Sequence, residues 1–160
     1  MQYVYPAIFR KDKTMNDTWA VEFPDVEGGV TCGYSLYDAL LMAEDVLNLS
    51  LWDLEENGKQ DEIPTPTPLD KVVLKPNETV RMIYADTEVY AKKVAEQLKR
   101  EEIETAANPI KAVRESKGWT IKEFADFLHA PYRTIQDWNA GKTQPPKWIA
   151  TLIIDKVQSA

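Results

Sequence analysis

The last third of the chain carries helix caps and stops at such short intervals that only a bundle of small helices satisfies them. Asn108 is a favoured capping residue, and it precedes Pro109, whose fixed backbone angle suits the first position of a helix. Thr120 and Glu123 have the spacing of a capping box, in which each side chain bonds the other residue's backbone amide. Glycine readily takes the left-handed conformation that ends a helix, and the expected stops are Gly118 and Gly141.

Apolar residues recur in this segment with the spacing of helices that bury one face. Pro131 and the pair Pro145-Pro146 mark the starts of the last two helices. The side chains expected in the small core are Ile110, Val113, Phe124, Ala125, Leu128, Ile135, Trp138, Trp148, Ile149, Leu152, Ile153 and Val157. We therefore predict an all-α domain over residues 108 to 160.

The front of the chain shows the two-residue alternation of β-strands, interrupted by one long helical pattern. The four predicted strands are residues 2 to 10, 18 to 23, 30 to 34 and 79 to 85. The first three form an antiparallel meander, and Pro6 favours a position at a sheet edge. Ser35 caps a helix whose apolar stripe runs to a stop at Gly58. The expected order is β-β-β-α-β, and the fold class of the whole chain is α+β.

Proline stands at every second position between Ile63 and Leu69, which excludes a helix there and favours an extended segment. Asp86 or Thr87 caps a further helix, which continues into a charged run. The predicted organisation is a domain over residues 1 to 85, a linker helix over 86 to 107 and a second domain over 108 to 160.

The net charge of −7 is unevenly distributed along the chain. Residues 1 to 85 carry 7 basic and 15 acidic side chains, whereas residues 109 to 160 carry 8 basic and 5 acidic ones. The acidic front suits a basic partner, and the basic rear is able to approach phosphate groups. Cys32 and His129 are the only residues of their types, so we expect no disulfide, no metal site and no cofactor. No apolar run has the length of a membrane span and no secretion signal is present, so a cytoplasmic protein without membrane contact is expected.

Within the predicted helical domain, two stretches resemble a helix-turn-helix of the Cro/repressor type. Residues 120 to 125, Thr-Ile-Lys-Glu-Phe-Ala, match its first helix, and residues 134 to 142, Thr-Ile-Gln-Asp-Trp-Asn-Ala-Gly-Lys, match its second. Phe124 stands where leucine is common in that family, and Asn139 stands where an acid often helps to hold the fold. The resemblance implies that this domain binds DNA.

In the helix-turn-helix family the second helix of the pair enters the major groove, where its outward side chains meet base edges. Arg133 suits guanine, Gln136 suits adenine, and Asp137 either accepts from cytosine or orients Arg133. The resemblance implies the following DNA-binding residues: Thr120, Lys122, Tyr132, Arg133, Thr134, Gln136, Asp137 and Lys142. One such domain makes few phosphate contacts, so we expect a homo-oligomer, a dimer or a tetramer, on operator DNA.

The front domain is similar to HicB-type antitoxins at positions spread over two motifs. The matching residues are Phe23, Asp25, Gly33, Ser35, Ala39, Ile63, Pro64, Pro66 and Pro68. The resemblance covers residues 1 to 95 and implies a partial ribonuclease H-like fold that binds a small, basic, mRNA-cleaving toxin of the HicA kind. The helix-turn-helix behind it then represses the operon that encodes both proteins.

The toxin-binding residues are a hypothesis based on charge: the acidic turn with Asp25 and Glu27, and the pair Asp61 and Glu62 before the prolines. An alternative function is a stand-alone transcription regulator whose front domain senses a small ligand. A nuclease is a third interpretation, for which the available carboxylates are Glu22, Asp25, Asp38, Glu44 and Asp45. Helix capping and exposed helix faces account for most of these side chains, so we expect no catalytic residues and no enzyme.

Overall fold

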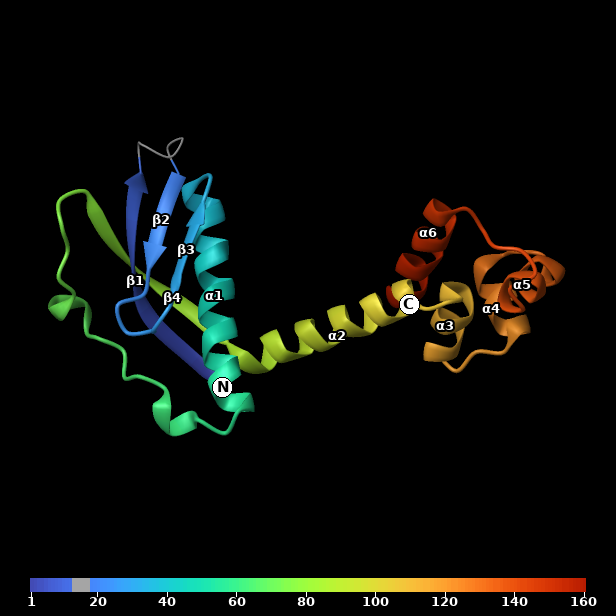
Figure 1. The fold of residues 1–160 in the computed structure, drawn as a ribbon, viewed down its shortest axis with the longest axis horizontal. Coiled ribbons are helices and arrows are strands. Elements are labelled where there is room, and N and C mark those ends of the chain that lie inside the picture. Colours follow the sequence, from blue (N-terminus) through green and yellow to red (C-terminus); the bar gives the residue numbers. More distant parts are fainter. Residues whose placement is uncertain (13–17) are drawn as a thin grey trace. The chain divides into compact units, whose positions relative to one another are not determined.

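The computed structural model describes residues 1–12 and 18–160. Its elements in chain order are β1 (Gln2–Asp12), β2 (Thr18–Glu22), β3 (Val30–Gly33), α1 (Leu36–Glu56), η1 (Gln60–Glu62), η2 (Leu69–Lys71), β4 (Glu78–Asp86), α2 (Thr87–Thr105), α3 (Pro109–Ser116), α4 (Ile121–Leu128), α5 (Tyr132–Asn139) and α6 (Lys147–Gln158), as labelled in Figure 1. Two compact units, Met1–Val94 and Ala95–Ala160, divide within α2. Among these residues, every helix is too short or too polar to cross a bilayer.

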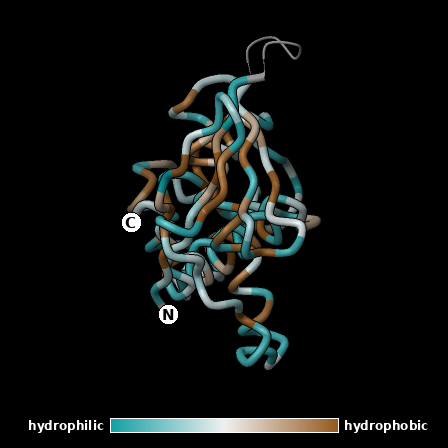
Figure 2. The backbone as a smooth tube through the Cα atoms, turned by 90° about the vertical axis from the view of Figure 1, so that its left-hand side faces the viewer, coloured by the Kyte–Doolittle hydropathy of each residue, from teal (hydrophilic) through white to brown (hydrophobic). Residues whose placement is uncertain are grey.

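The first unit is an antiparallel sheet with the strand order β3-β2-β1-β4, and α1 lies across one of its faces (Figure 1). The predicted meander of the first three strands is confirmed, and the fourth strand returns beside β1. Alternate residues of β1, namely Tyr5, Ala7 and Phe9, are buried, so that one side of the sheet meets α1, and brown hydrophobic stretches run along the backbone in Figure 2. The buried residues of this core are Tyr5, Ala7, Phe9, Val21, Phe23, Val26, Ala39, Ala43, Leu47, Leu51, Ile83 and Ala85.

Pro6 lies in an inner strand, so the prediction that it sits at a sheet edge was wrong. The strand that contains it pairs with β4 from Gln2 to Arg10, but it pairs with β2 only from Ile8 onward. Pro6 therefore has a strand partner on one side alone, opposite Met82. An inner strand tolerates proline at this point because β2 has not yet begun to pair, and the missing N–H leaves no partner unsatisfied.

The start of α1 shows why the sequence carries a glycine shortly before the predicted cap. Ser35 caps the helix by accepting from the Asp38 amide at 3.1 Å, while the Asp38 carboxylate accepts from the Tyr34 amide at 2.8 Å. Gly33 is buried beneath the first turn, and a Cβ atom there would stand 2.3 Å from the backbone nitrogen of Ala39. Only glycine lets the strand approach the helix so closely.

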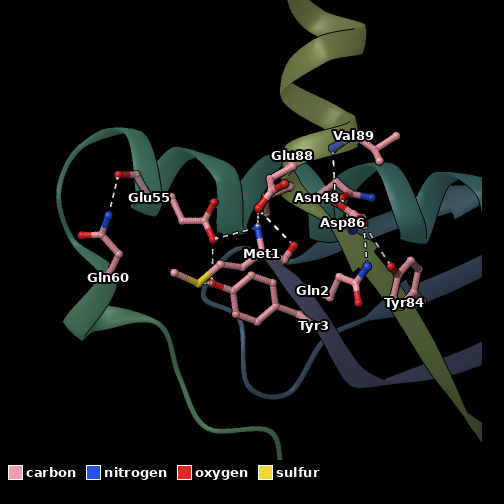
Figure 3. A network of polar contacts seen from close by, with 11 residues as sticks. Met1, Gln2, Tyr3, Asn48, Glu55, Gln60, Tyr84, Asp86, Glu88 and Val89 are labelled. Carbon is pink, nitrogen blue, oxygen red and sulfur yellow. Dashed lines mark hydrogen bonds and ion pairs between the residues drawn. The ribbon is translucent and has the colours of Figure 1, made fainter.

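Polar contacts join the ends of β1 and α1 to the start of α2 (Figure 3). The buried Thr87 donates its amide to the Met1 carbonyl at 3.0 Å, and Asn48 of α1 accepts from the Asp86 amide at 2.9 Å. Asp86 also accepts from Gln2 and caps α2 through the Val89 amide, and these hydrogen bonds lower the pKa of its carboxyl group. The network fixes how β4 turns into α2.

The second unit is a bundle of short helices around a core of its own. Its buried residues are Ile103, Ile110, Val113, Phe124, Ala125, Ile135, Ile153, Ile154 and Val157. The predicted caps are confirmed: Asn108 caps α3 with Pro109 at its first position, and a full capping box opens α4. Two residues of the predicted core are not in it, because Trp148 and Leu152 lie on the solvent side of α6 and are 65% and 57% exposed. Their spacing matched a helix face, but periodicity alone does not say which face is buried.

Candidate functional site

Helices α4 and α5 form a tight pair, joined by the three residues His129, Ala130 and Pro131. His129 takes the left-handed conformation (φ 53°) that lets the chain leave α4, and Pro131 precedes the first residue of α5. Phe124 and Ala125 from α4 and Ile135 from α5 are buried in the same core. The pair therefore presents its other faces to solvent in a geometry that packing holds.

A partly buried arginine ties the end of α5 to α3. The side chain of Arg114 is 13% exposed, donates to Asn139 Oδ1 at 2.9 Å and also donates to the Trp119 carbonyl. Asn108 adds a second link, because its Nδ2 donates to the carbonyls of Trp138 and Asn139 at 2.9 and 3.2 Å. The amide oxygen of Asn139 therefore receives a charge-assisted hydrogen bond at the position where related helix-turn-helix sequences often carry an acid.

The outward residues of α5 form a small network of charges. Arg133 is 74% exposed in its side chain, and its Nε lies 3.3 Å from Asp137 Oδ2. Its guanidinium also donates to Gln136 Oε1 at 3.3 Å, while Lys142 Nζ lies 3.9 Å from the other Asp137 oxygen. Tyr132 is half exposed at the start of the helix. Asp137 therefore pairs with Arg133, in keeping with the second of the two roles considered for it, while Lys142 approaches its other oxygen without a hydrogen bond.

The start of α4 holds the remaining residues of the predicted DNA surface. The Thr120 amide donates to Glu123 Oε2 at 2.7 Å, and the Glu123 amide donates to Thr120 Oγ1 at 3.2 Å. The first of these bonds lowers the pKa of the Glu123 carboxyl group. The capping box thus uses the Thr120 amide, whereas the following amides of Ile121 and Lys122 have no described hydrogen bond. Lys122 and Thr134 lie on the accessible side of their helices.

In the first unit, Asp25 connects the two motifs that the sequence showed far apart. Its Oδ2 accepts from the Thr67 amide at 2.9 Å, and its Oδ1 accepts from the Thr67 hydroxyl at 2.5 Å. The Tyr5 hydroxyl donates to the Pro64 carbonyl, and burial together with the nearby Asp25 charge raises the pKa of that phenol. An extended proline segment offers few backbone donors, and Asp25 binds one of them, which explains why the two motifs occur together.

Three of the four acidic residues assigned to toxin binding line one groove of about 520 Å³. Asp25 and Glu27 come from the turn after β2, and Glu62 comes from η1. Asp53 of α1 adds a carboxylate that sequence reasoning missed, because it reaches the groove only through the packing of α1 beside the turn after β2. Asp61 is exposed but does not line the groove. Glu62 is partly neutralised by Lys59 at 3.3 Å.

The carboxylates considered for catalysis do not converge. Asp38 is engaged at the start of its own helix, Glu22 lies on the sheet face away from α1, and Glu44 and Asp45 lie on α1. In residues 1–12 and 18–160, no three His, Cys, Asp or Glu side chains are grouped as metal ligands would be.

The comparisons with known proteins agree with the architecture. Residues 5–123 match the model of a family described as the HicB-like antitoxin of bacterial toxin-antitoxin systems. A solved chain from a toxin-antitoxin complex of Streptococcus pneumoniae has 22% sequence identity and a TM-score of 0.51, covering 89% of this chain and all of that one, a similarity of fold. A search of curated proteins gave no match. Because the family match spans most of its length, the chain belongs to the HicB-like antitoxins.

Proposed function

We propose that the first unit neutralises a small, basic, mRNA-cleaving toxin of the HicA kind, and that the second unit binds operator DNA and represses the operon that encodes both proteins. Membership of the antitoxin family supports the toxin partner. The family match ends at Glu123, early in α4, so the DNA-binding part rests on the geometry of α4 and α5.

The observation that supports DNA binding is the solvent-facing side of α5. It carries Arg133 and Gln136, which suit base edges, and Asp137, which pairs with Arg133. Arg133 is held by Asp137, and a guanidinium fixed in this way loses less conformational freedom when it bonds guanine in the major groove. Gln136 stands one turn further along and suits adenine. The helix-turn-helix pairing places such a helix in the groove while its partner crosses the backbone.

Phosphate contacts are expected from the start of α4 and from two lysines. The free amides at the N-terminus of a helix attract phosphate, and those of Ile121 and Lys122 remain available beside the capping box. The Lys122 and Lys142 side chains are exposed. If each half-site neutralises about four phosphates, the logarithm of the binding constant of a dimer falls with the logarithm of salt at a slope of about −7.

The test of DNA binding is a mobility-shift titration of the full chain on the DNA upstream of its own operon. Arg133→Ala weakens specific binding by about tenfold to a hundredfold and relaxes the preference at one base pair. Lys111→Ala removes an exposed lysine of α3 and serves as the control, with binding unchanged. An Arg133→Ala protein with the affinity and sequence preference of the original would refute the assignment of α5 as the recognition helix.

Toxin binding is assigned to the acidic groove of the first unit. That unit carries 17 acidic and 9 basic side chains, so a basic toxin is attracted to it. Asp25 is already bonded to Thr67, which leaves Glu27, Asp53 and Glu62 as the carboxylates able to pair with the toxin. The Asp25 carboxylate instead holds one wall of the groove.

Co-expression with the toxin gene that neighbours this one tests the groove. A double change of Glu27→Lys and Glu62→Lys is expected to abolish rescue of cell growth while DNA binding persists. Glu22→Lys, on the opposite side of the sheet, is the control for the added positive charge. Full rescue by the double variant would show that the toxin binds outside this groove. Rescue that requires an intact α5 would contradict the assignment of toxin binding to the first unit alone.

A further inference from the structure

The outer edge of β4 is the longest free strand edge in the described part of the protein. This nine-residue strand ends the sheet on one side, whereas β3, at the other end, has four residues. A long exposed edge presents unpaired amides and carbonyls and acts as a template for another strand. Natural proteins shorten or cover such edges unless a partner uses them.

Two hydrogen bonds establish which residues of β4 direct their backbone amides and carbonyls away from β1. The Thr87 amide donates to the Met1 carbonyl at 3.0 Å, in register with the pairs Tyr5↔Ile83 and Ala7↔Arg81. In an antiparallel pair the bonding residues alternate, so odd-numbered residues of β4 bond to β1. The Asp86 amide confirms the alternation, because it points away from β1 to Asn48 Oδ1. The remaining outward amides and carbonyls belong to Val80, Met82 and Tyr84, and no described hydrogen bond engages them.

Apolar side chains surround this free edge. Met82 and Tyr84 are 43% and 48% exposed on the sheet face away from α1. At the end of this edge, a groove of about 550 Å³ runs between α1, the end of β4 and the first turns of α2. It is lined by Leu41, Met42, Glu44, Asp45, Asn48, Tyr84, Asp86, Val89, Tyr90 and Lys93, of which Leu41 and Val89 are also well exposed. The edge therefore combines free backbone groups with nearby apolar area.

The charges near the edge are complementary to those of the same strand in a second molecule. Glu44 and Asp45 line the groove and have no described ion pair. Arg81 lies on β4 itself, is exposed, and has no described partner. In its own chain Arg81 forms no described ion pair with Glu44 or Asp45. A second strand running antiparallel brings another Arg81 towards these carboxylates of α1.

We propose that two copies of this chain pair through β4, antiparallel and related by a two-fold axis at Met82, so that their sheets become one. In this register Val80 pairs with Tyr84 of the second copy, Met82 with Met82, and Arg81 with Ile83, which directs Arg81 to the carboxylates of the other copy's α1. The ladder stops after Tyr84 because Asn48 occupies the next outward amide. The contact is isologous, as two-fold interfaces are. It does not depend on the proposed DNA binding, although a dimer would supply the second recognition helix.

Cross-linking of the full chain tests the axis directly. In a Cys32→Ser background, Met82→Cys is expected to form a disulfide-linked dimer under mild oxidation, because paired Cα atoms in a ladder lie within disulfide reach. Val4→Cys is the matched control: Val4 lies on the same sheet face and is equally exposed, but it belongs to the inner strand. Equal cross-linking of the two variants would overturn the proposal.

Sedimentation of the reduced full chain tests the backbone pairing. Val80→Pro removes one outward amide at a position where an edge strand accepts proline, and it is expected to weaken the dimer at least tenfold, whereas Val80→Ala weakens it less. Arg81→Glu weakens the dimer more at low salt than at high salt. Circular dichroism verifies that each variant is folded. A monomeric original chain at tens of micromolar, or a dimer that survives Val80→Pro but is lost with Trp148→Glu on α6, would refute the β4 contact.

Discussion

The two units of this antitoxin reach stability by different routes. The first depends on strands that are distant in sequence: β1 pairs with β4 across about seventy intervening residues, a loop whose closure costs conformational entropy. The second consists of helices that caps and glycine stops define locally, tied together by Asn108 and Arg114. The first unit carries 9 basic and 17 acidic side chains and the second 10 and 9, so the two surfaces suit different partners. Each unit therefore has a core of its own and a surface of different charge.

The strongest test of this contrast removes one fully buried phenylalanine from each core. Phe9→Ala in β1 and Phe124→Ala in α4 each cost about 3 to 5 kcal/mol in unfolding free energy, because each leaves a cavity. We expect thermal unfolding to show two transitions. Phe9→Ala lowers the midpoint temperature of the first unit's transition, and Phe124→Ala lowers that of the second unit's transition. A single transition that both variants shift equally would mean that the units unfold together.

A smaller loss of stability is expected when the hydrogen bonds made by Arg114 or by Asp25 are removed. Arg114→Ala costs about 2 to 3 kcal/mol, since it strands the Trp119 carbonyl and the Asn139 side chain in a mostly buried place. Asp25→Ala costs about 1 to 2 kcal/mol, because it removes the two hydrogen bonds that hold Thr67 of the proline segment. Hydrogen exchange provides the readout: the Thr67 amide loses protection in the second variant while amides of the sheet keep it. Loss of protection throughout the sheet would show that the proline segment supports the core.

Helix caps are expected to contribute about equally in the two units. Thr120→Ala and Ser35→Ala each cost about 1 kcal/mol, because each leaves an amide of the first turn without its acceptor. Denaturant titration of each variant measures the cost. Because α4 has two turns and α1 has more than five, we expect the change in α4 to lower DNA affinity as well. If a destabilised Thr120→Ala protein binds DNA with unchanged affinity, the cap of α4 does not contribute to the proposed DNA binding by α4 and α5.

The smallest effects concern pH. Asp86 in the first unit and Glu123 in the second have carboxyl pKa values lowered by hydrogen bonds. Their contribution is present above the pKa of the unfolded chain, about 4, and is lost as the pH falls through the folded value. We expect the unfolding temperature of both units to fall in acid. Asp86→Asn is expected to flatten the pH dependence of the first unit's transition, and Glu123→Gln that of the second unit's transition.

In alkali the two units diverge. Burial and the hydrogen bond to Glu55 raise the pKa of Tyr3 to about 12. The neutral phenol therefore contributes stability that is complete below the unfolded pKa of about 10 and is lost as the pH rises towards 12. The first transition is expected to weaken more in this range with Tyr3 than with Tyr3→Phe. An identical decline in the two proteins would show that another group controls alkaline unfolding.

The sequence predicted the elements well where a local signal was decisive. Asn108, Thr120 and Ser35 cap the helices that they were expected to cap, and the strands and the long helix appear where alternation and helical spacing placed them. Two local signals misled. Pro6 indicated an edge, but its strand is inner and merely lacks a partner on the β2 side at that residue. Trp148 shared the helical spacing of a core residue while facing solvent.

The candidate surfaces depended more on tertiary structure. The pairing of Arg133 with Asp137 was one of two roles that the sequence suggested for that acid, but the approach of Lys142 to the same carboxylate was not foreseen. Asp25 was assigned to a partner on charge alone, and the structure shows that both its oxygens bind Thr67. Asp53 joined the acidic groove only when α1 packed beside the turn after β2.

By itself the sequence determined where helices begin and end, which residues alternate along strands, and how charge divides between the front and the rear, because these depend on neighbours within a few positions. Only the tertiary structure decided that β4 pairs with β1 and leaves its outer edge free, that Asn139 accepts a hydrogen bond from Arg114, and that distant acids share a groove. These features depend on contacts between residues far apart in the chain, which local patterns do not encode.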